Sequence, residues 1–318
     1  MTQHRDSNVN PVQIRDLEYF LACCEAGSFT AAARTMHIVQ SAMSSAVARL
    51  EHDLGAPLFD RSVTPVAVTE HGAVLRASAR HVLDAVQAAR DDVAAVSGQV
   101  CGTVVLGSTL NSGPLDLAAV LADCRDHHPG VIIHLRQSTA GSAGNLRAVL
   151  DGSIDLALTA STANPVTGQP PRRVVLHPLV SEALVFACRP DHPLAGRPEV
   201  GVSDLADETL LRFPPGWGVR ETIDRVLGEL PGATEIADYA LMTKLVQSGF
   251  GTTLIPESAI AAVPGLRSVP VADPRLRWNL SAAVSASRRP TAATTVLLRA
   301  LTRASAPSPA DDTQSAYT

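Results

Sequence analysis

Residues 28–61 read SFTAAARTMHIVQSAMSSAVARLEHDLGAPLFDR, and their apolar residues recur at helical spacing in two separate sets. The first set is Phe29, Ala32, Ala33 and Met36, and the second is Met43, Val47, Leu50 and Leu54. Each set falls on one face of a helix. The spacing therefore predicts a short helix followed by a longer one, and both apolar faces need a partner in the fold.

A preceding helix over residues 15–26 supplies that partner. Its apolar residues are Leu17, Phe20, Leu21 and Cys24. Gly27 followed by Ser28 is typical of a helix end and of the turn into the next helix. Three helices then share one small core, which leaves the outer face of the last helix small and polar. The residues on this face are Ser41, Ser44, Ser45, Ala48 and His52.

A long helix with one buried face and one polar face is typical of a helix-turn-helix whose second helix enters the major groove of DNA. Two short runs, residues 58–61 and 66–68, flank a turn and predict a two-stranded wing. The spacing alone also suits an ordinary helical subdomain with solvent-facing serines, because helix-turn-helix patterns have many false positives.

A dense, ordered set of residues between 20 and 72 resembles the amino-terminal signature of the LysR-type transcriptional regulators. The set is Phe20, Ala26-Gly27-Ser28-Phe29-Thr30, Ala32-Ala33, Gln40, Ala42, Ser44, Leu50-Glu51, Leu54-Gly55, Leu58-Phe59, Arg61, Thr69-Glu70 and Gly72. The resemblance implies an α/β protein with an N-terminal, all-α winged helix-turn-helix over residues 13–68, which binds double-stranded DNA at a dyad-symmetric promoter site. The DNA contacts that we expect are Ser28, Thr30, Gln40, Ser41, Ser44, Ser45, Arg49 and Arg61.

The charge of the chain argues against strong DNA binding. The net charge is −5, and residues 1–68 hold five arginines against seven acidic residues. The chain also has Val39 where the family commonly has a serine, and Ser45 where it commonly has a basic residue. Gln40 remains as a base reader, because its amide can pair with adenine through two hydrogen bonds. Two alternatives stay open: a small-molecule-binding protein with weakened or lost DNA readout, and a regulator that needs no effector.

Residues 69–97 form an unbroken helical pattern without proline. Apolar residues recur along it at steps of four and three, which is a heptad seam. They are Leu75, Ala79, Val82, Val86, Ala89, Val93 and Val96. The resemblance implies that this linker helix pairs with a second copy in a homodimer, or in a homotetramer built as a dimer of dimers, with Leu75, Val82, Val86 and Val93 in the interface. Alternatively, the seam packs on its own domain.

Beyond residue 98 short apolar runs alternate with helical ones, which predicts a parallel sheet. The expected strands include residues 131–137, 174–177, 183–188 and 234–238, and the expected helices include residues 241–247. The resemblance implies that residues 98–303 form an effector-binding domain of two α/β lobes similar to periplasmic binding proteins. Lobe I takes about 98–160 and 269–303, and lobe II takes about 161–268. Residues 1–12 are expected to form a flexible N-terminus, and residues 304–318 a disordered tail.

Ligands of open α/β sheets bind outside the carboxyl ends of strands, where helix starts offer free amides. Three segments fit this description: residues 108–112, 138–142 and 214–218. The effector contacts that we expect are Ser108, Thr109, Asn111, Thr139, Ser142, Phe213, Trp217 and Phe250. Positive helix ends, together with loops that lack lysine and arginine, favour a small carboxylate or a polar aromatic ligand. Taken singly, each polar residue equally suits a cap or a turn.

No motif in the sequence indicates an enzyme. G-x-S-x-G, a phosphate-binding loop and H-E-x-x-H are missing, and no cysteine and histidine spacing suits a metal, so we expect no catalysis, metal or cofactor. The five cysteines are expected to be core residues, because oxidant sensors of the family keep two in the second lobe, where only Cys188 lies. The absence of a long apolar run or signal-peptide centre predicts a cytoplasmic protein without membrane contact. The resemblance also allows a contact with RNA polymerase.

Overall fold

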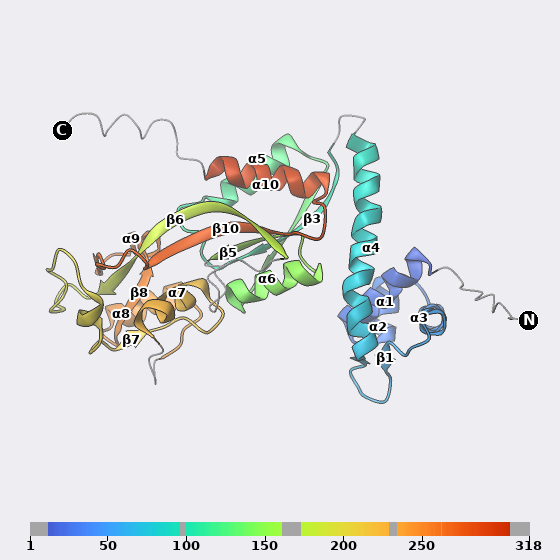
Figure 1. Ribbon diagram of the computed structural model, residues 1–318, viewed down its shortest axis with the longest axis horizontal. Coiled ribbons are helices and arrows are strands. Elements are labelled where there is room, and N and C mark those ends of the chain that lie inside the picture. Colours follow the sequence, from blue (N-terminus) through green and yellow to red (C-terminus); the bar gives the residue numbers. More distant parts are fainter. Residues whose placement is uncertain (1–11, 96–99, 161–172, 229–233, 262, 306–318) are drawn as a thin grey trace, which may run out of the picture. The chain divides into compact units, whose positions relative to one another are not determined.

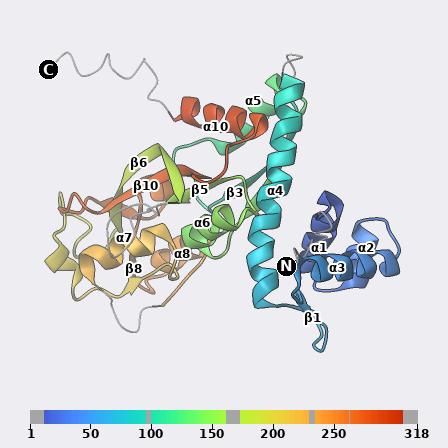
Figure 2. The ribbon, with the colours of Figure 1, turned by 45° about the vertical axis from the view of Figure 1, so that its right-hand side comes forward.

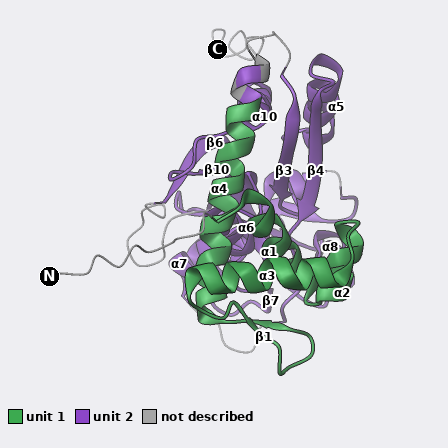
Figure 3. Ribbon diagram, turned by 90° about the vertical axis from the view of Figure 1, so that its right-hand side faces the viewer, with its two compact units in different colours: residues 1–90 green, residues 91–318 purple. Residues whose placement is uncertain are grey.

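A computed structural model describes residues 12–95, 100–160, 173–228, 234–261 and 263–305, drawn as ribbon in Figure 1. The expected flexible N-terminus up to residue 11, the tail from residue 306 and Val96 of the seam lie outside these described residues. The chain divides into two compact units, residues 1–90 and 91–318 (Figure 3). Among the described residues, no helix has both the length and the apolar character that crossing a membrane requires.

The first unit is a three-helix core with a wing. Its elements are α1 (Ile14–Ala26), α2 (Phe29–Thr35), α3 (Gln40–Leu54), β1 (Phe59–Asp60), β2 (Ala67–Val68) and the first part of α4 (Glu70–Ala95). Strands β1 and β2 pair antiparallel, which confirms the wing. The centre of the core holds Phe20, Met43, Val47 and Leu50, all with no exposed surface. The ring of Phe59 lies 5.4 Å from the ring of Phe20 and so attaches the wing to this core.

One predicted core residue of α3 is wrong. Leu54 is 43% exposed, whereas Ala46, which the spacing did not select, is 3% exposed. Met43, Ala46, Val47 and Leu50 complete a buried face at helical steps of three and four. Leu54 is the last residue of α3, and Gly55 then ends the helix with a left-handed backbone at φ 69°.

The linker helix α4 begins one residue after Thr69, whose hydroxyl oxygen accepts a hydrogen bond from the amide of Gly72 at 3.1 Å. The seam of this helix divides into two parts. Leu75 and Ala79 pack on the core of the first unit, whereas Val82 is 44% exposed and Val93 is 73% exposed. The alternative that the seam packs on its own domain therefore holds for Leu75 and Ala79, and not for Val82 or Val93.

The second unit is built on one mixed sheet with the strand order β4-β3-β5-β10-β6-β8-β7, and β9 pairs with β6. The strands are β3 (Gly102–Ser108), β4 (Val131–Gln137), β5 (Leu156–Ala160), β6 (Val174–Cys188), β7 (Leu210–Leu211), β8 (Thr252–Pro256), β9 (Arg267–Val269) and β10 (Arg277–Ser285). The sheet is not all parallel, because the long strands β6 and β10 run antiparallel to each other and to their neighbours. These two strands connect the two lobes.

Lobe I holds β3, β4 and β5 with three helices, and lobe II holds β7, β8 and β9 with three others. The helices of lobe I are α5 (Leu117–His127), α6 (Gly141–Asp151) and α10 (Ala292–Ala304), and those of lobe II are α7 (Gly218–Leu227), α8 (Tyr239–Gln247) and α9 (Glu257–Ala261). Helices α5 and α10 lie on one side of the sheet and α6 lies on the other (Figures 1 and 2). The amide of Ala143, near the start of α6, donates to the carbonyl of Gly216, just before α7 in the other lobe, so the two helix starts lie close together.

Two features of the strand prediction in this unit are wrong, namely a break after residue 177 and a strand at residues 234–238. The expected strands 174–177 and 183–188 are one strand, β6, which accommodates Pro178 by a shift of register between Leu280 and Ser281 of β10. The expected strand 234–238 is reduced to an isolated bridge between Glu235 and Arg212. The bridge consists of two backbone hydrogen bonds, from the amide of Arg212 to the carbonyl of Thr234 and from the amide of Ile236 to the carbonyl of Arg212.

Candidate functional sites

The outer face of α3 is open to solvent at its amino end. Gln40, Ser41 and Ser45 are exposed and Ser44 is half-buried. The residue before the helix is Val39, and no side chain caps the helix start. The first amides of α3 are therefore available to a phosphate group, which favours the positive end of a helix.

Two of the expected DNA contacts, Ser28 and Thr30, lie at the start of α2. Thr30 is exposed, whereas the hydroxyl oxygen of Ser28 accepts a hydrogen bond from the amide of Ala31 at 3.4 Å and so caps α2. A serine that caps a helix through its hydroxyl oxygen keeps its hydroxyl hydrogen free to donate to a phosphate. Both positions are consistent with backbone contacts to DNA, which fix the orientation of a protein without reading the sequence.

The two arginines of the expected DNA surface are paired inside the unit. Arg49 donates from Nε and Nη2 to the two carboxylate oxygens of Asp16, at 2.9 and 2.5 Å, and Asp16 is only 2% exposed. Arg61 donates to Glu51 at 2.9 Å and lies over the ring of Phe29, 5.0 Å from its centre. Their charges already balance carboxylates, so the unit offers little uncompensated positive charge to DNA.

A small cavity lies between the lobes of the second unit. Its volume for water-sized molecules is about 20 Å³, which holds one water molecule. The residues that line it are Thr109, Leu110, Asn111, Ser138, Gly141, Ser142, Ala160, Trp217, Gly218, Val219, Tyr239 and Trp278. None of these twelve described residues carries a charged side chain.

The structure brings four of the expected effector contacts together and separates the others. Thr109, Asn111, Ser142 and Trp217 line the cavity. Ser108 is buried and donates its hydroxyl to the carbonyl of Thr109 at 2.9 Å, outside the lining. Thr139 is exposed beside the cavity, and Phe213 is buried behind Trp217, with the two rings stacked 5.3 Å apart.

Phe250 does not belong to this cavity. It is 57% exposed and lines a separate depression with Arg189, His192 and Glu208. Its place in the chain explains the error, because Phe250 precedes strand β8 and therefore lies at the amino end of that strand. The cavity lies at the other edge, where β7 runs parallel to β8 and leads into the loop before α7.

Several expected polar contacts also hold their own loops. The hydroxyl of Thr109 donates to the carbonyl of Asn111 at 2.7 Å, and the side-chain oxygen of Asn111 accepts from the amide of Gly113 at 2.9 Å. Ser142 accepts from the amide of Ala160 at 2.9 Å and so ties α6 to β5. The Ser142 hydroxyl still has its hydrogen free to donate to a ligand, whereas the Thr109 hydroxyl can donate only to a ligand that replaces the carbonyl of Asn111.

Sequence reasoning missed the aromatic side chains of the cavity other than Trp217. Trp278, in β10, is 1% exposed, and Tyr239 begins α8. Burial raises the pKa of the Tyr239 hydroxyl, and the neighbouring Asn111 side chain lowers it by less. Tyr239 therefore stays neutral at physiological pH. Neither residue follows a parallel strand, so the rule that selected the loops gave no signal for them.

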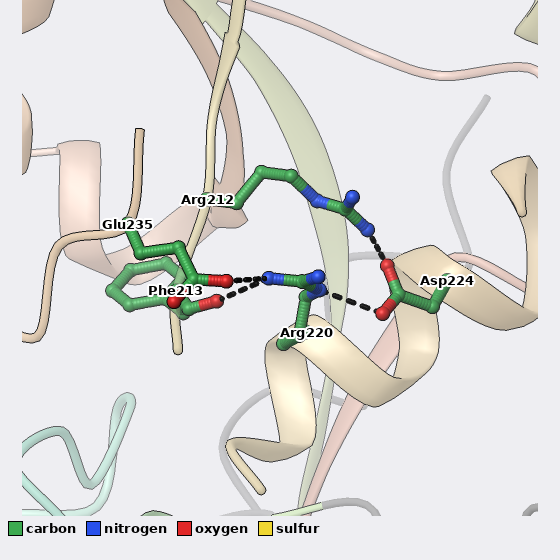
Figure 4. Close-up of polar contacts among 5 residues, drawn as sticks. All are labelled: Arg212, Phe213, Arg220, Asp224 and Glu235. Atoms are coloured by element: carbon green, nitrogen blue, oxygen red, sulfur yellow. Dashed lines mark hydrogen bonds and ion pairs between the residues drawn. The ribbon is translucent and has the colours of Figure 1, made fainter. Parts of the chain in front are cut away.

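Figure 4 shows a network of the charged side chains Arg212, Arg220, Asp224 and Glu235 next to Phe213. Arg220, on α7, donates to the carbonyl of Phe213 at 3.0 Å, to Glu235 at 2.9 Å and to Asp224 at 2.6 Å. Asp224 also pairs with Arg212, which is 1% exposed. Because Phe213 stacks on Trp217, this network fixes the position of the indole that lines the cavity.

The indole nitrogen of Trp217 is a buried hydrogen-bond donor at the cavity. Trp217 is 6% exposed, and its Nε1 has no hydrogen-bond partner among the described residues. The helices α6 and α7 both begin at the cavity, and no side chain caps either start. A buried donor and two positive helix ends favour a ligand that accepts hydrogen bonds.

Comparisons with known proteins agree with this architecture. The family model of the bacterial regulatory helix-turn-helix protein, lysR family, matches residues 14–73, and that of the LysR substrate binding domain matches residues 97–306. A probable hydrogen peroxide-inducible genes activator of Mycobacterium avium is 33% identical over 254 residues, which are 78% of this chain and 78% of that protein.

Two solved structures show the same fold. A full-length, cysteine-to-aspartate variant of OxyR from Pseudomonas aeruginosa matches with a TM-score of 0.73 over 92% of this chain and 98% of that chain, at 22% identity. Full-length CbnR in complex with its target DNA matches with a TM-score of 0.57 over 92% of this chain and 100% of that chain, at 21% identity. The chain belongs to the LysR family of bacterial helix-turn-helix transcriptional regulators.

Proposed function

We propose that this regulator presents α3 to the major groove of a dyad-symmetric promoter site. A small molecule that binds between the lobes changes how the subunits bind the DNA. The observation that carries the proposal is the uncapped, solvent-exposed amino end of α3, with Gln40, Ser41 and Ser45 on its surface. Such a surface combines free amides for a phosphate with one amide side chain that can read adenine. We also propose a cytoplasmic location, because bacterial chromosomal DNA lies there.

The paired arginines set the expected strength of this binding. Log affinity falls with log salt by about 0.9 for each phosphate that a protein neutralises on B-DNA. Arg49 and Arg61 already bind Asp16 and Glu51, so each subunit neutralises few phosphates. We expect modest affinity per subunit and a shallow salt dependence, with specific binding that depends on two subunits engaging the two halves of the site together.

A gel shift on the DNA upstream of the protein's own gene, at several salt concentrations, tests the proposal. Ser44→Glu places a carboxylate on the face that meets phosphates and base edges, and we expect it to abolish specific binding with no change in folding. Ala118→Glu, on the exposed surface of α5, adds the same charge far along the chain and is the control. Equal affinity of Ser44→Glu and wild type would refute the role of α3, and no binding by wild type at any salt would favour a small-molecule-binding protein without DNA readout.

The chemistry of the cavity narrows the class of effector. Its lining is uncharged, its aromatic walls are Trp217, Tyr239 and Trp278, and two helix starts face it. A small planar carboxylate suits these features, because the ring can lie against the aromatic walls and the carboxylate can accept from Trp217 Nε1 and from helix amides. A thermal-shift comparison of small carboxylates with their amides tests this class. We expect only the carboxylates to stabilise the protein, and Asn111→Ala to weaken the effect.

A further inference from the structure

The two lobes approach each other to backbone contact at Gly218, the first residue of α7. A Cβ atom built on Gly218 would lie 1.9 Å from the carbonyl oxygen of Ala160 and 2.4 Å from its carbonyl carbon. Ala160 ends β5 in lobe I, and both atoms belong to the backbone, so no side chain can rotate away to make room. Gly218 begins a regular helix and has no positive φ, and alanine is the better helix former. Space, and not backbone conformation, therefore requires glycine at this position.

Two more glycines make the same kind of contact beside it. A Cβ atom on Gly141, in lobe I, would lie 2.8 Å from the carbonyl oxygen of Gly216 and 2.8 Å from Cδ1 of Trp217, both in lobe II. A Cβ atom on Gly216 would lie 3.3 Å from the carbonyl oxygen of Ala140. The amide of Ala143, in α6, donates to the carbonyl of Gly216 at 3.0 Å, which is a direct hydrogen bond between the lobes.

These contacts account for the small size of the cavity. They lie at the starts of α6 and α7, which form part of its wall, and the enclosed volume is about 20 Å³. A planar carboxylate with a ring needs several times the space of the single water molecule that this volume admits. The same contacts bring two positive helix ends together, an arrangement that an anion between them would stabilise.

We propose that Gly141, Gly216 and Gly218 act as a glycine latch that lets the lobes close on each other without a ligand and thereby determines which ligands the site accepts. An effector larger than water binds only by separating the latch, so each ligand must offset the loss of the interlobe contacts. The latch selects for ligands whose acceptors replace the hydrogen bond from Ala143 and satisfy Trp217 Nε1. This inference rests on the proposed effector site, but its tests use no effector.

Quenching of tryptophan fluorescence by acrylamide tests the latch. The chain has two tryptophans, and both Trp217 and Trp278 line the cavity, so all tryptophan emission comes from this site. Gly218→Ala should hold the lobes apart and raise the quenching constant at least about twofold, because local opening exposes both indoles. Gly196→Ala is the matched control, since Gly196 is exposed, has no neighbour within 4 Å of its built Cβ atom and has no positive φ.

Each outcome of the quenching experiment decides the inference. A folded Gly218→Ala protein with the quenching constant of wild type would overturn the latch, and so would an equal rise in Gly196→Ala. Far-UV circular dichroism confirms folding. A failed latch would leave the thermal-shift test of carboxylates unaffected, so the two proposals fail separately.

A cross-link supplies a second test. It places a cysteine at Gly216, whose φ of 86° favours glycine, so far-UV circular dichroism must first confirm that the variants fold. The Cβ atom built on Gly216 lies 3.3 Å from that of Ala143, close to the spacing of a disulfide. The double variant Ala143→Cys with Gly216→Cys should form a disulfide under mild oxidation without ligand, whereas each single variant should not. Mass spectrometry of peptides under non-reducing conditions identifies the bond. A folded double variant that stays reduced would show that the lobes are apart in solution and would overturn the latch.

Discussion

At the scale of single residues, Arg49 shows how an internal partner can take over a side chain expected at a surface. Asp16 is 2% exposed, and an ionised carboxylate in such a place requires a partner. Arg49 supplies it from 33 residues along the chain. The sequence pattern of α3 predicts that Arg49 faces outward, and its side chain is indeed 42% exposed, but the pattern cannot show that Asp16 faces it from another helix. If Arg49 contacts DNA, its guanidinium therefore binds the phosphate and Asp16 at the same time.

His37, in the turn between α2 and α3, offers a test of local backbone strain. Its φ of 53° is the only positive value among the described residues other than glycine, and a left-handed conformation costs about 1–2 kcal/mol. Glycine removes that cost but loses more entropy on folding, by about 0.5–1 kcal/mol. We expect His37→Gly to raise the free energy of unfolding by about 0.5–1 kcal/mol, measured by urea denaturation.

Replacing a glycine that has a positive φ with alanine is the converse change, and it serves as the control for His37→Gly. Gly55 ends α3 at φ 69°, and its built Cβ atom has no neighbour within 4 Å. Gly55→Ala introduces strain without a clash and should lower the free energy of unfolding by about 1 kcal/mol. If Gly55→Ala destabilises but His37→Gly does not stabilise, the imidazole of His37 makes a contribution that exceeds the strain.

At the scale of elements, prediction succeeds where a local pattern determines structure and fails where pairing between distant segments does. The expected strand 131–137 coincides with β4, and the expected helices 15–26 and 241–247 differ from α1 and α8 by one and two residues at their starts. In contrast, Pro178 breaks the apolar pattern, yet β10 pairs across it and makes β6 continuous. Glu235 and its neighbours read as a strand, but a strand forms only where a partner completes the ladder.

The exposed part of the α4 seam tests whether this helix has a partner. Val82 is 44% exposed in the single chain, so aspartate there has little cost unless another helix covers it. In a paired interface a buried, unpaired charge costs about 3 kcal/mol or more. We expect Val82→Asp to raise the dissociation constant of the dimer about 100-fold, measured by analytical ultracentrifugation.

Ala73→Asp is the matched control for the seam. Ala73 is exposed on α4, nine residues before Val82 and half a turn away around the helix. We expect it to leave the dimer unchanged. A dimer of unchanged affinity in Val82→Asp would place the contact between subunits elsewhere, and an equal loss in both variants would indicate a general effect of charge on the helix.

At the scale of the whole molecule, the cavity is assembled from six parts of the chain, and the sequence predicted only three of them. The loops after β3, after β4 and before α7 follow from the rule that ligands bind beyond the carboxyl ends of strands. Tyr239 starts a helix and Trp278 lies within β10, so only the folded chain brings them to the same place. The extent of lobe closure also depends on interlobe contacts, such as that of Gly218 with Ala160, which no local pattern contains.

The burial of the cysteines predicts that this chain does not respond to peroxide, although two relatives are named as probable activators of hydrogen peroxide-inducible genes. Burial raises the pKa of the Cys188 thiol to about 11, that of Cys23 to about 11 and that of Cys24 to about 12. A raised pKa keeps the thiol protonated throughout the physiological range, and a pKa of about 11 leaves about one thiolate in 10⁴ at pH 7. The thiolate is the form that attacks peroxide.

We expect hydrogen peroxide to leave DNA binding in a gel shift unchanged at pH 7, and Cys188→Ala to behave as wild type. Cys101→Ser controls for the half-buried thiol of lobe I. Loss or gain of DNA binding on peroxide treatment that disappears in Cys188→Ala would show that Cys188 becomes exposed in a second conformation and acts as a sensor.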